Sequence, residues 1–155
     1  MKDEIFRFEW TGKLVSINKW HTLARIKRRS EYKYFVGISN AYKKLKKLLV
    51  TEIKKQDFKT YCDPVDMIIK VSRWKMADTG NIEKPVGDAL QEAGVLKNDR
   101  QVRHILILRD YHGKGEDDIL RVILFHTYNK DSFYEFVQRH LTVYNFYPGN
   151  PGLFI

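Results

Sequence analysis

Cysteine and long apolar runs are scarce in this sequence of 155 residues. Cys62 is the only cysteine, so no intrachain disulfide can form, and we expect it to be a small, partly buried residue. No apolar run reaches the length of about 18 residues that a membrane-spanning helix needs. Residues 1–7 lack the apolar core of a signal peptide. These absences predict a cytoplasmic protein with no membrane partner.

Several catalytic patterns are missing as well. The sequence has no Gly-rich phosphate-binding loop, and no set of serine or cysteine with histidine suggests covalent catalysis. The histidines show no spacing typical of metal ligands; they are His21, His104, His112, His126 and His140. Any catalytic site should therefore depend on residues other than a serine or cysteine nucleophile or a histidine metal cluster.

Apolar material is present in the amount that one folded domain requires. Hydrophobic residues make up 43% of the chain, and its length fits a single domain of ordinary size. Charged residues, at 30%, are too well mixed with apolar ones to indicate disorder. Because no repeat or linker interrupts the pattern, we predict one domain over residues 1–155.

Positive charge is concentrated in one part of the chain. Residues 13–59 contain 14 basic and three acidic residues, a net charge of +11, so the rest of the chain carries −2 of the total +9. Such a field favours a polyanion, usually nucleic acid, although a solubilising surface is the alternative. The candidate DNA-binding residues are Asn18, Lys19, Arg25, Lys27, Arg28, Arg29, Lys43, Lys44 and Lys47. The neighbouring aromatics could stack on unpaired bases or pack in a core; they are Trp20, Tyr32, Tyr34 and Phe35.

The first part of the chain alternates between extended and helical patterns. Residues 6–10 alternate apolar and polar side chains, which predicts a strand that ends at Gly12. Residues 16–21 read as a loop, and the basic segment that follows, to Gly37, is expected to be partly mobile. From Ser39 to Gln56 the spacing predicts a helix whose apolar face consists of Tyr42, Leu45, Leu48, Leu49 and Ile53. That face contains no Trp or Phe, which argues against a helix lying on a membrane.

The second part predicts a strand–helix–strand unit. Residues 65–74 read as a strand, and a turn at 78–81 leads into a helix over 82–93, with Asn81 as its N-cap and Gly94 as its end. Residues 102–108 and 119–127 read as two further strands, antiparallel to one another. A short helix over 132–140 and an aromatic tail complete a C-terminal extension, residues 128–155. The expected fold class is α+β (α/β), with a mixed sheet.

Two carboxylates are placed at the corners of this unit. Asp78 lies where the strand meets the helix, and Asp99 lies where the chain returns to the next strand. The unit can bring both to one edge of the sheet, and carboxylate oxygens suit Mg²⁺, which bridges to phosphate oxygens. Lys84 could offset phosphate charge, or could form a surface ion pair with Asp88 four residues on.

The sequence resembles the RusA family of Holliday-junction resolvases at these residues. The family's signature is an Asp-x-Asp-Asn-x-x-Lys run, then Asp and Leu four and six residues on, and a closing acidic pair followed by Val or Ile. The matching residues, in register and without a gap, are Asp78, Asn81, Lys84, Asp88, Leu90, Asp99 and Val102. Phe8-x-Trp10 and Ser16-x-Asn18 resemble the family's opening strand and loop. The resemblance spans residues 6–124 and is strongest over 78–102.

The resemblance implies a homodimeric α/β endodeoxyribonuclease that resolves branched DNA such as four-way junctions. It implies that carboxylates hold Mg²⁺, with Mn²⁺ as an alternative ion. By position, Asp78 and Asp99 would be metal ligands, and Lys84 would contact the scissile phosphate or assist its departure. Asn81, Asp88 and Asn98 would have structural roles near the site. The family often occurs in phage and prophage settings.

Two departures from the family pattern leave the activity open. Gly80 replaces the second Asp of the signature, and Asn98 replaces the first member of the closing acidic pair. Glycine has no side-chain ligand, and Glu83 could serve as a substitute near the start of the helix. The first hypothesis is therefore a Mg²⁺-dependent endonuclease. The alternatives are a protein that binds branched or duplex DNA without cutting it, and an interaction module that uses the tail, residues 144–155.

Overall fold

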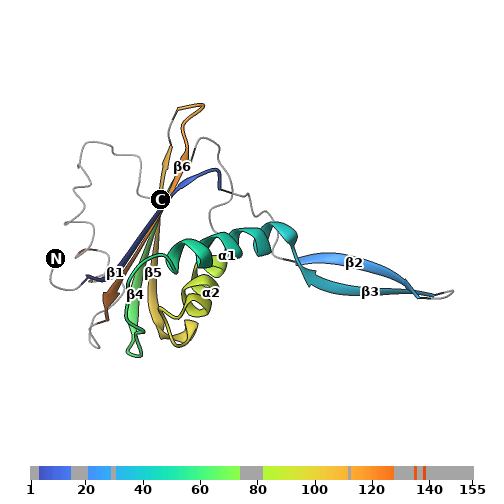
Figure 1. The fold of residues 1–155 in the computed structure, drawn as a ribbon, viewed down its shortest axis with the longest axis horizontal. Helices are drawn as coiled ribbons and strands as arrows, with labels where there is room; N and C mark the ends of the chain where they lie inside the picture. Colours follow the sequence, from blue (N-terminus) through green and yellow to red (C-terminus); the bar gives the residue numbers. More distant parts are fainter. Residues whose placement is uncertain are drawn as a thin grey trace.

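A mixed sheet of four strands forms the body of the protein. The computed structural model describes residues 4–14, 21–28, 31–73, 82–111, 113–127, 135 and 138. The sheet consists of β1 (Glu4–Gly12), β4 (Val65–Arg73), β5 (Val102–Tyr111) and β6 (Asp118–His126), in the order β1-β6-β4-β5 (Figure 1). β4 and β5 are parallel, whereas β6 is antiparallel to both β1 and β4. The predicted mixed sheet is confirmed.

β6 does not form a hairpin with β5, the strand that precedes it in the sequence. The sequence predicted residues 119–127 as a strand antiparallel to 102–108, and β6 does run opposite to β5. β6 nevertheless pairs with β4 and β1 rather than with its neighbour in the sequence. A central position suits β6 because it carries apolar residues on both faces. Val122, Leu124 and Phe125 are all buried there.

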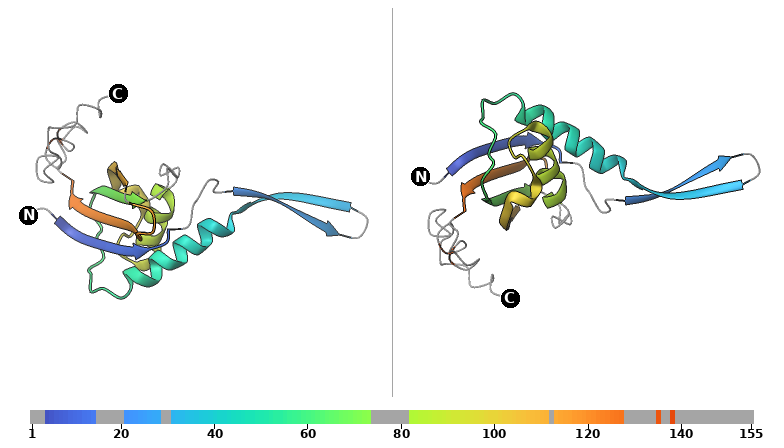
Figure 2. Two further views of the ribbon diagram at one scale, coloured as in Figure 1. Left: turned by 90° about the horizontal axis from the view of Figure 1, so that it is seen from above. Right: turned by 90° about the horizontal axis from the view of Figure 1, so that it is seen from below.

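Two helices cover one face of the sheet. α1 (Asn40–Ile53) and α2 (Glu83–Ala93) lie side by side on that face, and their apolar residues share a core with β1, β4 and β6 (Figures 1 and 2). Met67 and Ile69 of β4 belong to this core, whereas Ile68 packs with Ile123 and Phe125 in a second cluster. The alternation of a strand explains this division, since neighbouring residues point to opposite faces.

The helix ends follow local chemistry only in part. The Ser39 hydroxyl accepts a hydrogen bond from the Tyr42 backbone nitrogen at 3.2 Å and so caps α1. Gly94 ends α2 in the left-handed conformation, with φ of 93°, as predicted. The N-cap of α2 is Ile82, which makes no side-chain capping bond, rather than the predicted Asn81, which lies outside the described residues. Four of the five residues in the stripe predicted for α1 are buried; Leu48 is only partly buried, and the stripe omitted the buried Val50.

The basic segment before α1, where the sequence predicted no strand, forms a β-ribbon. β2 (His21–Arg28) and β3 (Glu31–Ile38) pair in antiparallel register, with Arg25 opposite Tyr34 and Lys27 opposite Tyr32. The ribbon extends away from the sheet, beyond the N-terminal end of α1 (Figures 1 and 2). His21, predicted as the end of a loop, is instead the first residue of β2. Basic residues between β-branched and aromatic ones obscured the strand period.

A buried aspartate of β4 contacts β5 and the residue that follows β6. Asp66, at the start of β4, is completely buried. Its Oδ1 atom lies 2.9 Å from Nδ1 of His104 and accepts a hydrogen bond from the Thr127 hydroxyl at 2.7 Å. Its Oδ2 atom has no hydrogen-bond partner in the described part of the chain. A buried polar side chain needs hydrogen-bond partners to be tolerated, so the cluster ties β4 to β5 and to the end of β6.

Three further expectations concern the periphery. Cys62 is exposed, so the expectation that it is partly buried was wrong; it lies in the connection before β4 rather than in an element that packs on the core. Glu135 and Gln138 are helical, within the range predicted for the short C-terminal helix, whereas the aromatic tail lies outside the described residues. No helix in the described ranges is long and apolar enough to cross a membrane.

Candidate active site

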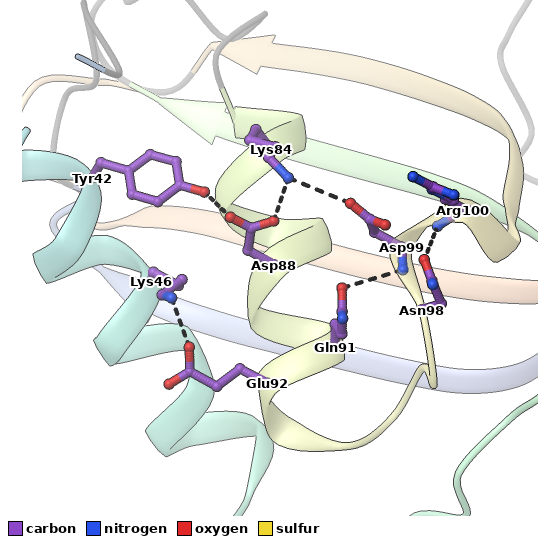
Figure 3. Close-up of polar contacts among 9 residues, drawn as sticks. All are labelled: Tyr42, Lys46, Lys84, Asp88, Gln91, Glu92, Asn98, Asp99 and Arg100. Carbon is purple, nitrogen blue, oxygen red and sulfur yellow. Dashed lines mark hydrogen bonds and ion pairs between the residues drawn. The ribbon is translucent and has the colours of Figure 1, made fainter. Parts of the chain in front are cut away.

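A short helical turn places Asp99 just before β5. The turn η2 (Asp99–Gln101) is capped by Asn98, whose side-chain oxygen accepts a hydrogen bond from the Arg100 backbone nitrogen at 2.9 Å. The Gln101 side chain accepts from the Asn98 backbone nitrogen at 2.7 Å and donates to the Tyr61 carbonyl at 3.0 Å. Gln91 of α2 accepts a hydrogen bond from the Asp99 backbone nitrogen at 3.3 Å (Figure 3). The backbone of Asp99 is therefore held on both sides, and its carboxylate remains 43% exposed.

The first turns of α2 bring a lysine between two carboxylates. Lys84 Nζ lies 2.6 Å from Asp88 Oδ1, one turn further along the helix, and 3.4 Å from Asp99 Oδ2 (Figure 3). The pairing of Lys84 with Asp88 is the one that the spacing of four residues permits. The contact with Asp99 shows that the start of α2 and the turn before β5 meet in space.

Tyr42 of α1 extends this cluster into the core. Its side chain is buried, and its hydroxyl donates a hydrogen bond to Asp88 Oδ2 (Figure 3). The carboxylate of Asp88 is thus held by one donor on each oxygen, from two different helices. Sequence reasoning placed Tyr42 only in the apolar stripe of α1, because a stripe of spacings three and four says nothing about the polar end of a tyrosine.

The charges of the cluster stabilise one another. The hydrogen bond to Asp88 raises the pKa of Lys84 against the opposing effect of burial, and Asp99 raises it further. Burial alone would raise the pKa of Asp88, but the hydrogen bonds from Lys84 and Tyr42 outweigh it and lower that pKa. Burial, reinforced by Asp88, raises the pKa of the Tyr42 hydroxyl. At neutral pH the cluster therefore contains an ammonium, a carboxylate and a protonated phenol.

A small cleft opens beside these residues. Its volume is about 140 Å³, enough for a few water molecules, and its lining combines polar groups of α2 with an apolar floor from β4 and β5. The lining residues are Met67, Glu83, Lys84, Gly87, Asp88, Asp99, Val102 and Ile105. A side chain at Gly87 would meet no atom within 4 Å, so this position leaves the cleft open. The cleft is the place where a phosphate or a hydrated ion could approach Lys84 and Asp99.

The donor chemistry of the cleft fits a magnesium ion, but the described residues supply only part of a site. Glu83 and Asp99 both line the cleft, and carboxylate oxygens are the ligands that Mg²⁺ prefers. Among the described residues, no group of three or more His, Cys, Asp or Glu side chains could hold a metal ion. Asp78, the other predicted ligand, lies outside the described residues, as do Gly80 and Asn81.

The predicted DNA-binding residues are divided between the ribbon and α1. Arg25, Lys27 and Arg28 lie on β2. Lys43, Lys44 and Lys47 are exposed on α1, the helix that also carries Tyr42. The remaining members of the set lie outside the described residues; they are Asn18, Lys19 and Arg29.

Comparison with known proteins places this arrangement in a family. The family model for the endodeoxyribonuclease RusA matches residues 23–119, which is more than half of the chain. The match runs from β2 to the start of β6 and includes the residues of the Lys84 cluster. No curated protein matches the chain. The chain belongs to the RusA family of endodeoxyribonucleases, the Holliday-junction resolvases.

Proposed function

We propose that this protein is a Mg²⁺-dependent, structure-selective endodeoxyribonuclease that resolves Holliday junctions or related branched DNA. The observation that carries the proposal is the position of the Lys84 ammonium between Asp88 and Asp99, at a cleft that Glu83 also lines. RusA resolvases depend in general on a divalent metal. A lysine beside partly exposed carboxylates supplies both the cationic and the anionic groups that such a reaction needs.

Four residues of the predicted site have chemical roles in this proposal. A bound Mg²⁺ or Mn²⁺ ion would activate a water molecule and stabilise the leaving oxygen. Asp78 and Asp99 would hold the ion, and Glu83 would replace the family carboxylate that is missing at Gly80. Lys84 would bind the scissile phosphate and stabilise the negative charge that develops on it as the phosphorus–oxygen bond breaks.

The β2–β3 ribbon and α1 would bind the arms of the junction. Residues 13–59, which contain both elements, carry a net charge of +11. A two-stranded ribbon has the dimensions to enter the major groove of DNA, and exposed lysines on a helix can contact phosphates. The ribbon projects from the body of the protein, so a duplex can approach it without meeting the sheet (Figure 1).

A homodimer would match the symmetry of the substrate. A four-way junction presents two symmetry-related strands, and an isologous dimer offers two matched active sites. Such an enzyme would act in the cytoplasm, in a phage or prophage setting, as the family resemblance implies. Sedimentation of the protein with and without a junction would measure this state directly.

A second candidate function is a resolvase fold that holds DNA without cutting it. Gly80 favours it, because the family's second Asp is absent there. Loss of a residue that supports a metal ligand costs about 10- to 100-fold in affinity or activity, and loss of a ligand should cost at least as much. A weaker alternative is an interaction module that uses the aromatic tail; truncation after residue 143 would then change the partners or the oligomeric state.

The decisive test compares cleavage of a labelled four-way junction by wild-type protein and by Gly80→Asp, with Mg²⁺ and with Mn²⁺. A linear duplex of the same sequence is the control for structure selectivity. We expect symmetric nicks in the junction from wild-type protein. Binding without nicks, with cutting gained by Gly80→Asp, would establish the second function, and absence of nicks from both proteins with both ions would contradict the nuclease proposal.

A further inference from the structure

The Lys84 ammonium lies closer to the carboxylate of Asp88 than to that of Asp99. The ammonium lies 2.6 Å from Asp88 and 3.4 Å from Asp99, so the stronger contact is the one inside α2. Charge-assisted contacts weaken at the longer distance. The Lys84 side chain is 41% exposed and flexible, so its ammonium could close on Asp99 if Asp88 did not hold it. The two contacts therefore compete for one lysine.

Asp88 can keep the closer contact with the Lys84 ammonium because its other oxygen atom is held in place. The Tyr42 hydroxyl donates to Asp88 Oδ2, and Tyr42 as a residue is only 4% exposed in the core between the helices and the sheet. A buried ring has little freedom, so its hydroxyl fixes the plane of the carboxylate and turns Oδ1 toward Lys84 (Figure 3). The chain of contacts runs from α1 through Asp88 to Lys84 and then to Asp99.

We propose that Tyr42 and Asp88 are positioning residues that hold the Lys84 ammonium on α2 and so keep Asp99 open to a divalent cation. The inference rests on the proposed function, because it takes Asp99 as a metal ligand. An ammonium in full contact with Asp99 would neutralise the carboxylate and would have to be displaced before an ion could bind. Held by Asp88, the same ammonium stays near enough to meet a phosphate that approaches the cleft.

Ordinary packing between helices is the competing explanation, and the structure contains a matched control for it. Lys46 of α1 and Glu92 of α2 form an ion pair at 2.7 Å, one turn further along α2 than Asp88 (Figure 3). This pair joins the same two helices without contacting Lys84. If Tyr42 and Asp88 served only to join the helices, Glu92→Gln would have the same consequences as Tyr42→Phe.

The experiment measures the affinity of the full-length protein for Mn²⁺ by isothermal titration calorimetry, without DNA. Tyr42→Phe keeps the buried ring and the net charge but removes the donor to Asp88. We expect it to weaken Mn²⁺ binding by about two- to tenfold, the range for loss of one hydrogen bond. Asp88→Asn should weaken binding by about 10-fold or more. Glu92→Gln should leave the affinity unchanged.

A double-mutant cycle separates competition from other causes. Asp88→Asn also removes a negative charge, and that loss is the same whether or not Lys84 is present. We therefore expect Asp88→Asn to cost much less affinity in a Lys84→Gln background, where no ammonium remains to close on Asp99. An equal cost in both backgrounds would show that Asp88 is itself a ligand, or acts only by its charge, and would overturn the inference.

The remaining outcomes distinguish this inference from the proposed function. If wild-type protein binds Mn²⁺ but Tyr42→Phe and Asp88→Asn bind it equally well, the positioning role is wrong and the metal site stands. If wild-type protein binds no Mn²⁺, the proposed metal site itself fails, and the inference fails with it. Circular dichroism melting of each variant verifies that it folds. If Asp88→Asn does not fold, the Mn²⁺ affinity of Tyr42→Phe alone tests the positioning role.

Discussion

The β2–β3 ribbon and the cleft beside α2 differ in how their charges are organised. In the ribbon, basic residues recur along two strands, with Arg25 and Lys27 opposite tyrosines in the register. In the cleft, one lysine lies between two carboxylates, at 2.6 Å from Asp88 and 3.4 Å from Asp99. Affinity for a polyanion depends on the number of positive charges, whereas catalysis depends on the position of a single group. Substitutions in the ribbon should therefore act gradually on DNA binding, and substitutions in the cleft should act sharply on the reaction rate.

The largest expected effect comes from the cleft. Lys84→Met keeps a stem of similar size but removes the ammonium, and we expect the single-turnover cleavage rate of a four-way junction to fall by about 100- to 1,000-fold. The dissociation constant for the junction, measured by gel shift, should rise far less, because Lys84 supplies only one of many phosphate contacts. Lys46→Met is the matched control, because Lys46 also pairs with a carboxylate of α2, at 2.7 Å. A similar loss of rate in both variants would contradict a special role for Lys84.

The second largest effect should be on stability, at a place that belongs to neither region. Asp66→Ala would leave His104 and Thr127 without their buried partner, and we expect the free energy of unfolding in urea to fall by about 2–3 kcal/mol. Thr127→Val removes one donor and should cost about 1 kcal/mol. Unchanged stability in Asp66→Ala would show that the cluster does not hold the strands. Either variant that folds should bind Mn²⁺ normally, which separates loss of fold from loss of function.

A smaller effect is expected from the ribbon. Arg25→Ala with Lys27→Ala should weaken junction binding by about 10-fold at near-physiological salt and should reduce the slope of log K against log salt by about one for each residue. The cleavage rate at saturating DNA should not change. Lys54→Ala with Lys59→Ala removes the same charge from exposed positions away from the ribbon. If that control had an equal effect, total charge rather than the ribbon would explain binding.

The smallest effect should appear in the pH dependence of stability. The pKa of Asp88 in the folded protein lies below its ordinary value of 3.8, because Lys84 and Tyr42 outweigh the effect of burial. The charged contacts of Asp88 therefore contribute stability above that ordinary value, and this contribution is lost as the pH falls through the lower folded-state pKa. Melting temperatures of wild-type protein and Asp88→Asn should converge as the pH is lowered from about 6 to about 3. A constant difference across this range would contradict the assignment.

Much of the fold could be predicted because it depends on local signals. The apolar stripe of α1, the helix α2 and its end at Gly94 follow from spacing and from glycine's access to the left-handed conformation. The pairing of Lys84 with Asp88 follows from helix geometry in the same way. The family signature also identified the segment that forms the cleft, although the position of Asp78 stays a prediction.

The features that could not be predicted depend on contacts between distant segments. Tyr42 and Asp88 are 46 residues apart, and neither the stripe of α1 nor the sequence of α2 indicates that their side chains meet. The order β1-β6-β4-β5 is likewise a property of the whole sheet rather than of any one strand. The ribbon was missed because lysines and arginines interrupt its apolar pattern, although the basic composition had already predicted a polyanionic ligand for this segment.

The proposed role of Asp99 in metal-dependent cleavage can be measured by single-turnover cleavage of a labelled four-way junction in Mg²⁺, with wild-type protein and Asp99→Asn at concentrations that bind all of the DNA. Asparagine preserves the size of the side chain but replaces the carboxylate that lies beside Lys84. We expect paired, symmetric nicks from wild-type protein and none from Asp99→Asn, with equal binding by both. Equal cleavage by the two proteins would contradict that role.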